Sequence, residues 1–378
     1  MRDAVIVEAV RAPVGKRNGA LAGIHPADLS AHVLSALVER AGIEPGDVDD
    51  VVWGCVSQAG EQAGNIARTA VLAAGWPESV PATSVDRQCG SSQQAVHAAA
   101  AGVIAGYYDI AVAGGVESMS RVPMGFARQG VEKPMAQSVL DRYGVKGFNQ
   151  GIGAEMVAEK WGFSRQQLDE YSLSSHAKAA AAVDAGALDA QLAKLPGVLE
   201  SDEGIRRGGT LETLGKLKTV FREDGVIHAG NSSQISDGTG ALLITTSEIA
   251  KARGLKPIAR VHTAVLAGDD PVMMLSAPWP ATHKALRKAG LSIDDIGAFE
   301  VNEAFAPVPL AWLAETGADP ARLNPVGGAI AVGHPLGGSG AVLMTRLVHH
   351  MRDNGIRYGL QTMCEGGGMA NATILELL

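Results

Sequence analysis

The most informative stretch of this chain is Val85-Asp86-Arg87-Gln88-Cys89-Gly90-Ser91-Ser92-Gln93-Gln94-Ala95-Val96. It leads into an Ala-rich segment that ends at Gly106, in which small residues surround the predicted helix and indicate burial on all sides. A cysteine at a helix N-terminus has a lowered pKa, because the helix dipole favours the thiolate. The Gly-Ser-Ser after Cys89 leaves backbone N–H groups free to stabilise an oxyanion. The local sequence predicts a nucleophile and leaves an inert buried cysteine equally open.

A second reactive residue, His334, stands between Gly333 and Pro335 where another predicted helix begins, over residues 334–351. A histidine in such a Gly-rich turn can act as a base or donate a hydrogen bond to an oxyanion. The turn does not have the G-x-G-x-x-G spacing of a dinucleotide site, because three apolar residues, 341–343, follow Gly340. We therefore set a dinucleotide site aside.

Two further candidates stand at the ends of predicted strands. Cys364 ends the strand 359–364 and precedes the glycines 366–368, and a cysteine there can act as an acid and base for a carbon atom. Asn302 ends the strand 296–302 and can orient a water or a carbonyl. Cys55 also ends a strand but lacks such surroundings, which favours a core position.

Helices and strands alternate in both halves of the chain. The patterns predict helices over 26–41, 64–74 and 281–290 and strands over 4–10, 48–54, 108–113, 240–245, 258–267 and 372–377. In each half a reactive residue precedes a helix, and a strand and a glycine cluster follow it, as a weak internal repeat. This repeat predicts two similar α/β halves.

The amino-acid composition changes over residues 119–234, which are more polar and charged than the rest of the chain. Helices are predicted near 152–161 and 165–186, the second with a capping box formed by Ser164 and Gln167. We expect three parts: an N-terminal half of residues 1–118 plus 235–258, an inserted loop domain of residues 119–234, and a C-terminal half of residues 259–378.

Composition narrows the class of protein. The 378 residues exceed the size of one core, and 46% of them are hydrophobic. The net charge of −8 argues against a nucleic-acid or membrane-surface binder, and no apolar run is long enough to span a membrane. Three cysteines without a CxxC pair favour a reducing compartment over disulfides or structural zinc. The N-terminus reads as a strand and not a signal peptide, so a cytoplasmic protein is expected.

Four motifs in order give the chain a resemblance to the thiolase family. They are Asp86-Arg87-Gln88-Cys89-Gly90-Ser91-Ser92, Asn302-Glu303-Ala304-Phe305, Gly327-Gly328-Ala329-Ile330-Ala331-Val332-Gly333-His334-Pro335 and Cys364-Glu365-Gly366-Gly367-Gly368. The likeness covers essentially the whole chain. It implies an α/β thiolase fold in which two βαβ-rich halves stack in five layers, α-β-α-β-α, with a CoA-binding loop domain that matches residues 119–234.

The resemblance also implies roles for five residues. Cys89 would be acylated, and His334 would activate it and, with a water held by Asn302, stabilise a thioester enolate. Cys364 would move the proton at the substrate's alpha carbon. The backbone N–H groups of Cys89 and Gly366 would form a second oxyanion hole, for the tetrahedral intermediate. The implied reaction is the reversible, ping-pong cleavage of a 3-ketoacyl-CoA by CoA, with CoA as a substrate and no tightly bound cofactor.

CoA contacts are predicted from the residues and from the resemblance. Residues 204–222 hold five basic residues against one acid, a basic island that suits phosphates: Arg206, Arg207, Lys216, Lys218 and Arg222. A solvated surface remains the alternative. The resemblance places further CoA contacts at Leu217, Ala229, Ser233, Gln150, Ala304 and Phe305, and includes Arg206. Leu275 stands where many members of that family have a small residue close to the acyl pocket.

Two other functions fit parts of this pattern. A decarboxylating ketoacyl synthase shares the fold but lacks a second catalytic cysteine, so Cys364 in its glycine cluster argues against it. A non-catalytic acyl-CoA-binding protein would be expected to lose Cys89, His334 or Cys364, and all three are present. Members of the family are dimers or tetramers, so we expect a homodimer or homotetramer that binds acyl-CoA and neither nucleic acid nor membrane.

Overall fold

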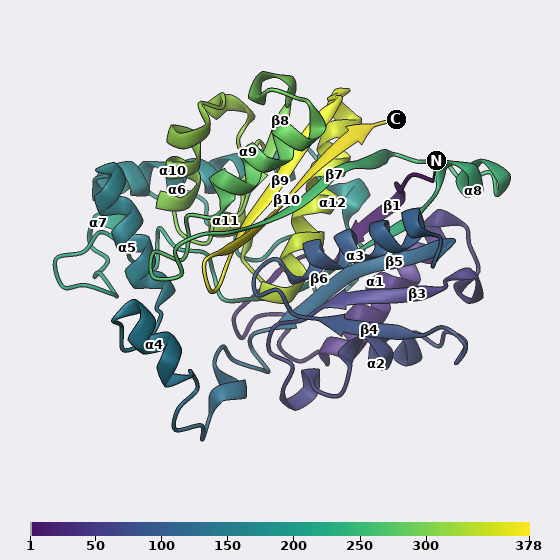
Figure 1. The fold of residues 1–378 in the computed structure, drawn as a ribbon, viewed down its shortest axis with the longest axis horizontal. Helices are drawn as coiled ribbons and strands as arrows, with labels where there is room; N and C mark the ends of the chain where they lie inside the picture. Colours follow the sequence, from purple (N-terminus) through teal and green to yellow (C-terminus); the bar gives the residue numbers. More distant parts are fainter. Residues whose placement is uncertain (1) are drawn as a thin grey trace.

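The computed structural model describes residues 2–378 and is built around one long sheet (Figure 1). The strands follow the order β4-β3-β5-β6-β1-β7-β10-β9-β8, with β2 paired beside β6. Their bounds are β1 Val5–Arg11, β2 Gly15–Lys16, β3 Asp50–Gly54, β4 Ala82–Val85, β5 Ile110–Ser118, β6 Ser236–Thr245, β7 Ala259–Gly268, β8 Ala298–Val301, β9 Tyr358–Glu365 and β10 Met369–Leu377. The two halves of the sheet meet where Val5 and Ile6 of β1 pair with Arg260 and Ala259 of β7.

The internal repeat predicted from the sequence is present in the sheet. In the N-terminal part β3 runs parallel to β5, and β5, β6 and β1 follow as antiparallel neighbours. In the C-terminal part β8 runs parallel to β9, and β9, β10 and β7 follow as antiparallel neighbours. These four strands therefore have the same order and directions in each half-sheet, and β4 and β2 are additions to the N-terminal one.

Helices and the two half-sheets form five layers. Helices α1 (Pro26–Ala41) and α2 (Ile66–Ala73) share a core with the outer face of the N-terminal half-sheet. Helices α9 (Pro278–Ala289) and α10 (Pro307–Thr316) do the same on the C-terminal half-sheet. Helices α3 (Ser91–Ala105) and α12 (Ser339–Asn354) lie between the half-sheets, packed on both. Two short helices, α8 (Ser247–Ala252) and α11 (Ala329–Val332), complete the halves.

The strand predicted over 108–113 was too short, because Gly114 and Gly115 lie inside β5 and do not end it. A Cβ on Gly115 would come within 2.4 Å of the Gly337 carbonyl oxygen, so a neighbouring loop passes directly over the strand. Close approach of a neighbouring backbone, and not a turn, therefore explains glycine at this position in the strand interior.

Residues 119–234 contribute helices and none of the strands of the sheet. The helices are α4 (Gln137–Tyr143), α5 (Gln150–Trp161), α6 (Arg165–Asp184) and α7 (Leu211–Gly215), which lie at the left of Figure 1. The predicted capping box of Ser164 and Gln167 is present at the start of α6. Ala154, Val157 and Leu168 share one core with α9 and α10, so this segment packs on the C-terminal half.

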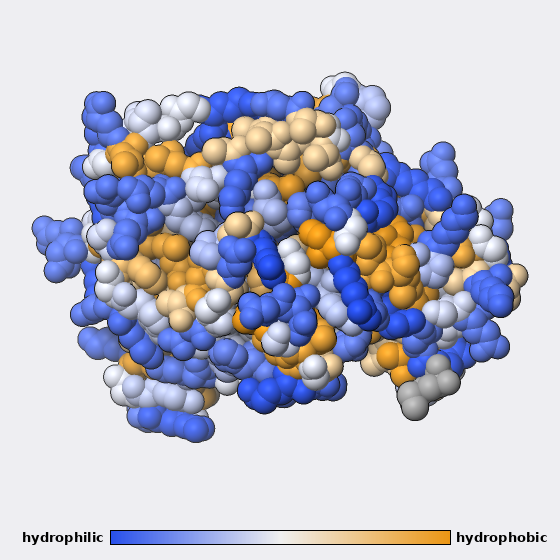
Figure 2. Space-filling model, turned by 90° about the horizontal axis from the view of Figure 1, so that it is seen from above, coloured by the Kyte–Doolittle hydropathy of each residue, from blue (hydrophilic) through white to orange (hydrophobic). Residues whose placement is uncertain are grey.

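The surface mixes polar and apolar side chains. On the face drawn in Figure 2, apolar areas are separated by hydrophilic side chains. Among residues 2–378, no helix combines the length and the apolar character needed to cross a membrane.

Candidate active site

The loop that carries Cys89 is held in a strained shape by two side chains. Gln88 has φ of 49°, a left-handed conformation that non-glycine residues adopt at a cost. Asp86 Oδ1 accepts a hydrogen bond from the Gln88 amide at 2.7 Å. Ser91 Oγ donates to the Gln88 carbonyl at 2.6 Å and accepts from the Arg87 amide at 2.9 Å. These bonds fix the backbone on both sides of Cys89.

Cys89 itself is a buried thiol, 4% exposed, that lies before Gly90, the N-cap of α3. Burial raises its pKa to about 12, and the lowering effect of the Gln150 side chain, whose Nε2 lies 3.9 Å from Sγ, is smaller. The sequence had suggested a lowered pKa from the helix N-terminus. Desolvation outweighs the dipole here, because Cys89 precedes the first helical turn and has little contact with water. The resting group is therefore a neutral thiol that needs a base.

His334 can supply that base through a defined tautomer. Its Nδ1 lies 2.6 Å from Ser339 Oγ, and the same hydroxyl donates to the Pro335 carbonyl at 3.0 Å. Because the hydroxyl hydrogen goes to Pro335, we assign the imidazole hydrogen to Nδ1 and an acceptor lone pair to Nε2. Burial lowers the pKa of His334 to about 4, so the ring is neutral near pH 7.

The first turns of α3 and α12 touch, which brings the two reactive loops together. Ser92 Oγ accepts a hydrogen bond from the Ala341 amide at 2.9 Å. A Cβ on Gly340 would lie 2.3 Å from the Gln93 nitrogen, so only glycine permits this approach. Leu336, two residues after His334, packs on Cys89.

Asn302 connects His334 with Cys364. It follows β8, Cys364 lies at the end of the parallel neighbour β9, and parallel strands present such ends at one edge of a sheet. Asn302 Nδ2 lies 3.4 Å from His334 Nε2. Burial raises the pKa of Cys364, as does a negative charge at Cys89, while hydrogen bonding from the Asn302 side chain lowers it. The two thiols therefore lie close enough to influence each other's charge.

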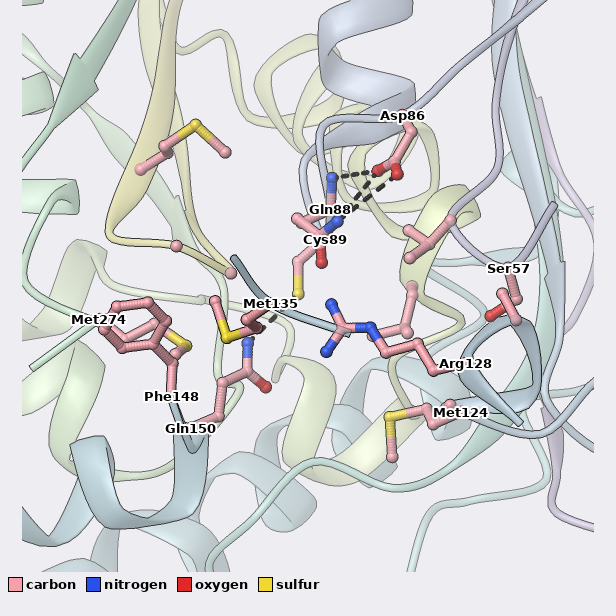
Figure 3. A pocket seen from close by; sticks show the side chains of 17 residues that line it. Ser57, Asp86, Gln88, Cys89, Met124, Arg128, Met135, Phe148, Gln150 and Met274 are labelled. Carbon is pink, nitrogen blue, oxygen red and sulfur yellow. Dashed lines mark hydrogen bonds between the residues drawn. The ribbon is translucent and has the colours of Figure 1, made fainter. Parts of the chain in front are cut away.

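A cavity of about 520 Å³ opens beside Cys89 (Figure 3). Gly366 and Gly367, from the cluster after Cys364, line one side. Gln88 and Gln150 also line it, as do four methionines: Met124, Met135, Met274 and Met369. The cavity thus gives Cys89 and the Gly366 backbone access to a bound molecule.

The predicted CoA contacts of the loop domain converge with those of the C-terminal half. The Ser233 amide donates to the Ala304 carbonyl at 2.9 Å, and Ser232 bridges to Phe305 as in an antiparallel pair. Phe221 packs edge-on against Phe305, with ring centroids 6.0 Å apart.

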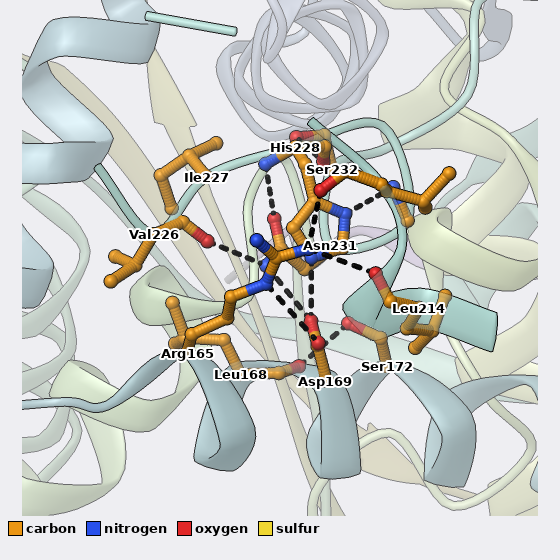
Figure 4. A network of polar contacts seen from close by, with 12 residues as sticks. Arg165, Leu168, Asp169, Ser172, Leu214, Val226, Ile227, His228, Asn231 and Ser232 are labelled. Atoms are coloured by element: carbon orange, nitrogen blue, oxygen red, sulfur yellow. Dashed lines mark hydrogen bonds and ion pairs between the residues drawn. The ribbon is translucent and has the colours of Figure 1, made fainter. Parts of the chain in front are cut away.

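A buried polar network holds the loops that carry these contacts (Figure 4). Asp169 Oδ1 accepts from His228 Nε2 at 2.7 Å and from Asn231 Nδ2 at 3.1 Å, which fixes the loop that includes Ala229. Arg165 donates to the carbonyls of Leu214 and Leu217 at 2.8 and 2.6 Å. Helix α6 therefore positions both predicted CoA loops.

The basic island is less uniform than its sequence indicates. Three members pair with acids: Arg207 with Asp184 at 2.7 Å, Lys216 with Glu212 at 2.7 Å, and Arg222 with Glu159 at 3.0 Å. The structure records no ion pair between residues 2–378 for the exposed side chains of Arg206 and Lys218. Lys218 and Leu217 line an open cavity of about 480 Å³, together with the acids Glu223 and Asp224. Of the five basic residues of the island, Arg206 and Lys218 are the two that form no ion pair within residues 2–378.

Comparison with known proteins matches both halves of the chain. The thiolase N-terminal domain model matches residues 4–248, and the thiolase C-terminal domain model matches residues 255–377. The chain belongs to the thiolase family. Members of this family are acyltransferases, and the chain is accordingly an enzyme of that class.

Individual thiolases resemble the chain over its full length. A steroid 3-ketoacyl-CoA thiolase of Mycobacterium tuberculosis is 49% identical, with 100% of this chain and 95% of that protein covered. A 3-ketoacyl-CoA thiolase of Aeromonas salmonicida is 43% identical, with 100% of both covered. The crystal structure of the acetyl-CoA acetyltransferase of Bacillus anthracis superposes with a TM-score of 0.92 at 36% identity, covering 100% and 99% of the two chains. The thiolase fold expected from the motifs is confirmed.

Two carboxylates of this thiolase went unnoticed in the sequence. Glu117, at the end of β5, accepts from the amides of Val56, Ser57 and Gly337 at 2.8–3.0 Å and so joins the N-terminal half to the loop after His334. Glu303 accepts from Ser175 Oγ and from the Ile330 amide, and so joins α6 to the short helix before His334. A charged residue beside an otherwise apolar strand is the signal that could have found them.

Leu275 lies next to the cavity in sequence but is not among the residues that line it. Leu275 is fully buried in the core of the C-terminal half, and its neighbour Met274 lines the cavity. Met274 has φ of 62°, a left-handed conformation that non-glycine residues seldom adopt.

Proposed function

We propose that this thiolase cleaves a 3-ketoacyl-CoA with CoA, giving acetyl-CoA and a shortened acyl-CoA, and also catalyses the reverse condensation. The observation that carries this proposal is the convergence of His334, Asn302 and Cys364 beside Cys89, from loops distant in the sequence. The printed names of the relatives, 3-ketoacyl-CoA thiolases among them, support the same substrate class.

In the first half-reaction His334 Nε2 takes the thiol proton and Cys89 Sγ attacks the 3-keto carbon. The amides of Cys89 and Gly366 stabilise the resulting oxyanion, which collapses with cleavage of the C2–C3 bond. This leaves an acyl-Cys89 and the enolate of acetyl-CoA. Cys364 then gives its proton to C2, and acetyl-CoA departs. The buried Asn302 Oδ1, which has no hydrogen-bond partner among residues 2–378, is a suitable acceptor for a water that stabilises the enolate.

In the second half-reaction a CoA thiol attacks acyl-Cys89. The Cys364 thiolate takes the CoA proton, and the released Cys89 thiolate recovers the proton held by His334. Both cysteines return to the thiol form, which is the favoured state in a buried site. The cycle consumes one CoA and needs no other reactant.

We assign CoA to the loop domain of residues 119–234 and the edge of the C-terminal half. Arg206 and Lys218 would meet its phosphates, and Leu217, Ala229, Ser233, Ala304, Phe305 and Gln150 its remaining length. The convergence of Ser233 with Ala304 supports this path. We also retain the division into residues 1–118 plus 235–258, 119–234 and 259–378, a homodimer or homotetramer, and a cytoplasmic location, the last supported by three buried free cysteines.

The acyl-enzyme tests the proposal. Incubation with an acyl-CoA, followed by peptide mass spectrometry, is expected to find the acyl group on Cys89. A Cys89→Ala variant should carry none and should lose thiolysis. An adduct on Cys364 with none on Cys89 would overturn the assignment of the nucleophile, whereas thiolysis by Cys89→Ala would overturn the mechanism.

A further inference from the structure

The cavity beside Cys89 extends away from most of the proposed CoA contacts. Of those contacts only Gln150 lines it; Leu217, Ser233 and Phe305 do not. Because a bound thioester must reach Cys89 from the CoA side, the rest of the cavity is left for the acyl group.

Most of the cavity wall suits an irregular apolar group. Met124, Met135, Met274 and Met369 line it with Phe148. Methionine side chains are unbranched and polarisable, and they adapt to ligand shapes that a rigid wall would reject. These residues would hold the carbon skeleton of an acyl group.

Arg128 is the one basic residue among those that line this cavity. It ends the short 3-10 helix Phe126–Arg128, and in Figure 3 its guanidinium points toward the space between Cys89 and Gln150. Other arginines nearby are engaged: Arg121 pairs with Glu61, and Arg142 lies over the Tyr143 ring. Within residues 2–378, no ion pair or side-chain hydrogen bond engages the guanidinium of Arg128.

The one acid among the residues that line the cavity is not paired with this charge. Asp86 lines the cavity, but its Oδ1 holds the Gln88 amide at 2.7 Å and it forms no ion pair with Arg128. Arg128 is exposed, so a wholly apolar acyl group beside it would leave the guanidinium to water and offer it no acceptor. A carboxylate would supply two oxygens for the planar, fork-shaped donor.

We propose that the acyl group cleaved by this enzyme carries a second carboxylate, remote from the thioester, and that Arg128 binds it. The proposal rests on the thiolase reaction proposed above and names the substrate class for it: 3-ketoacyl-CoA thioesters of dicarboxylic acids.

Paired substrates provide the test. Two series of 3-ketoacyl-CoA thioesters, matched in chain length, end in a carboxylate or in a methyl group. The wild type is expected to have a kcat/KM about tenfold higher for the carboxylate at its preferred length, as a charge-assisted pair predicts. Added salt should reduce that ratio, because the pair is partly exposed.

Three variants make the test specific. Arg128→Met should abolish the preference by lowering kcat/KM chiefly for the carboxylate series, and Arg128→Lys should keep part of it. Arg253→Met, which removes an equal charge from an exposed pair with Asp47 at 2.7 Å, should keep the wild-type preference.

The outcomes separate this inference from the proposed function. Cleavage of both series without preference at any length refutes the role of Arg128 and leaves the thiolase reaction intact. An equal loss on both series in Arg128→Met, with a raised KM for CoA, assigns Arg128 to CoA and overturns the inference. If neither series is cleaved and Cys89 is not acylated, the proposed function itself fails. If Arg128→Met does not fold, the wild-type ratio of kcat/KM between the two series and its salt dependence still decide whether a carboxylate is bound.

Discussion

His334 Nδ1 and Ser339 Oγ lie 2.6 Å apart, and the Ser339 hydroxyl donates onward to the Pro335 carbonyl at 3.0 Å. The serine hydroxyl can therefore only accept from the imidazole, which leaves the Nε2 lone pair facing Asn302. Ser339 is the first residue of α12, so the start of this helix sets the tautomer of the residue proposed as the base.

Replacement of Ser339 tests this relationship. Ser339→Ala should lower kcat by about tenfold to a hundredfold, because the imidazole loses the acceptor that selects its tautomer. The KM for CoA should change little. Ser339→Thr, which keeps the hydroxyl, should restore most of the rate. A wild-type kcat in Ser339→Ala, measured by steady-state thiolysis, would show that the tautomer is set elsewhere.

Cys364→Ser tests the proposed proton carrier. The pKa of Cys364 is already raised by burial, and a serine hydroxyl is a far weaker acid. The variant should still be acylated at Cys89 by an acyl-CoA but should lose roughly a hundredfold or more in turnover. Exchange of the alpha hydrogens of acetyl-CoA with deuterated water should fall in parallel. Cys55→Ser, which changes another buried cysteine, is the control and should keep the exchange. Wild-type exchange in Cys364→Ser would contradict the assignment.

Arg206→Ala and Lys218→Ala test the proposed phosphate contacts. Both should raise the KM for CoA by about three- to tenfold and lower kcat less, because they remove binding common to ground and transition states. Arg207→Ala should have a smaller effect, since Arg207 already pairs with Asp184 at 2.7 Å. If the KM for CoA of all three variants equalled that of the wild type, the island would be solvated surface.

Glu300→Gln tests a buried carboxyl in β8. Burial raises the pKa of Glu300 to about 8, from a value near 4.5 in the unfolded chain. Between these two pH values the folded state binds the proton that the unfolded state releases, so this group makes stability fall as pH rises. Relative to Glu300→Gln, the wild type should lose up to about 1.4 kcal/mol of unfolding free energy per pH unit in that window. Urea denaturation from pH 5 to 8 measures it, and a difference that is constant with pH would contradict the raised pKa.

Much of the fold could be predicted from the local sequence. The predicted helix over 26–41 coincides with α1, because Pro26 opens it and Gly42, with φ of 68°, closes it. The sequence pattern of residues 119–234 likewise predicted α5 and α6 to within a few residues. Helix caps, hydrophobic periodicity and turn residues each involve only a few neighbouring positions, so they can be recognised in the sequence without a structure.

The sequence by itself determined the family, since Cys89, His334, Asn302 and Cys364 stand in motifs that resemble those of thiolases and both thiolase domain models match the chain. Only the tertiary structure decided their states and surroundings. Burial by distant segments leaves Cys89 a neutral thiol, contrary to the effect expected from its helix, and a short loop brings Arg128 into the cavity beside it. Desolvation and cavity shape depend on contacts between residues far apart in the chain, and no local pattern encodes those contacts.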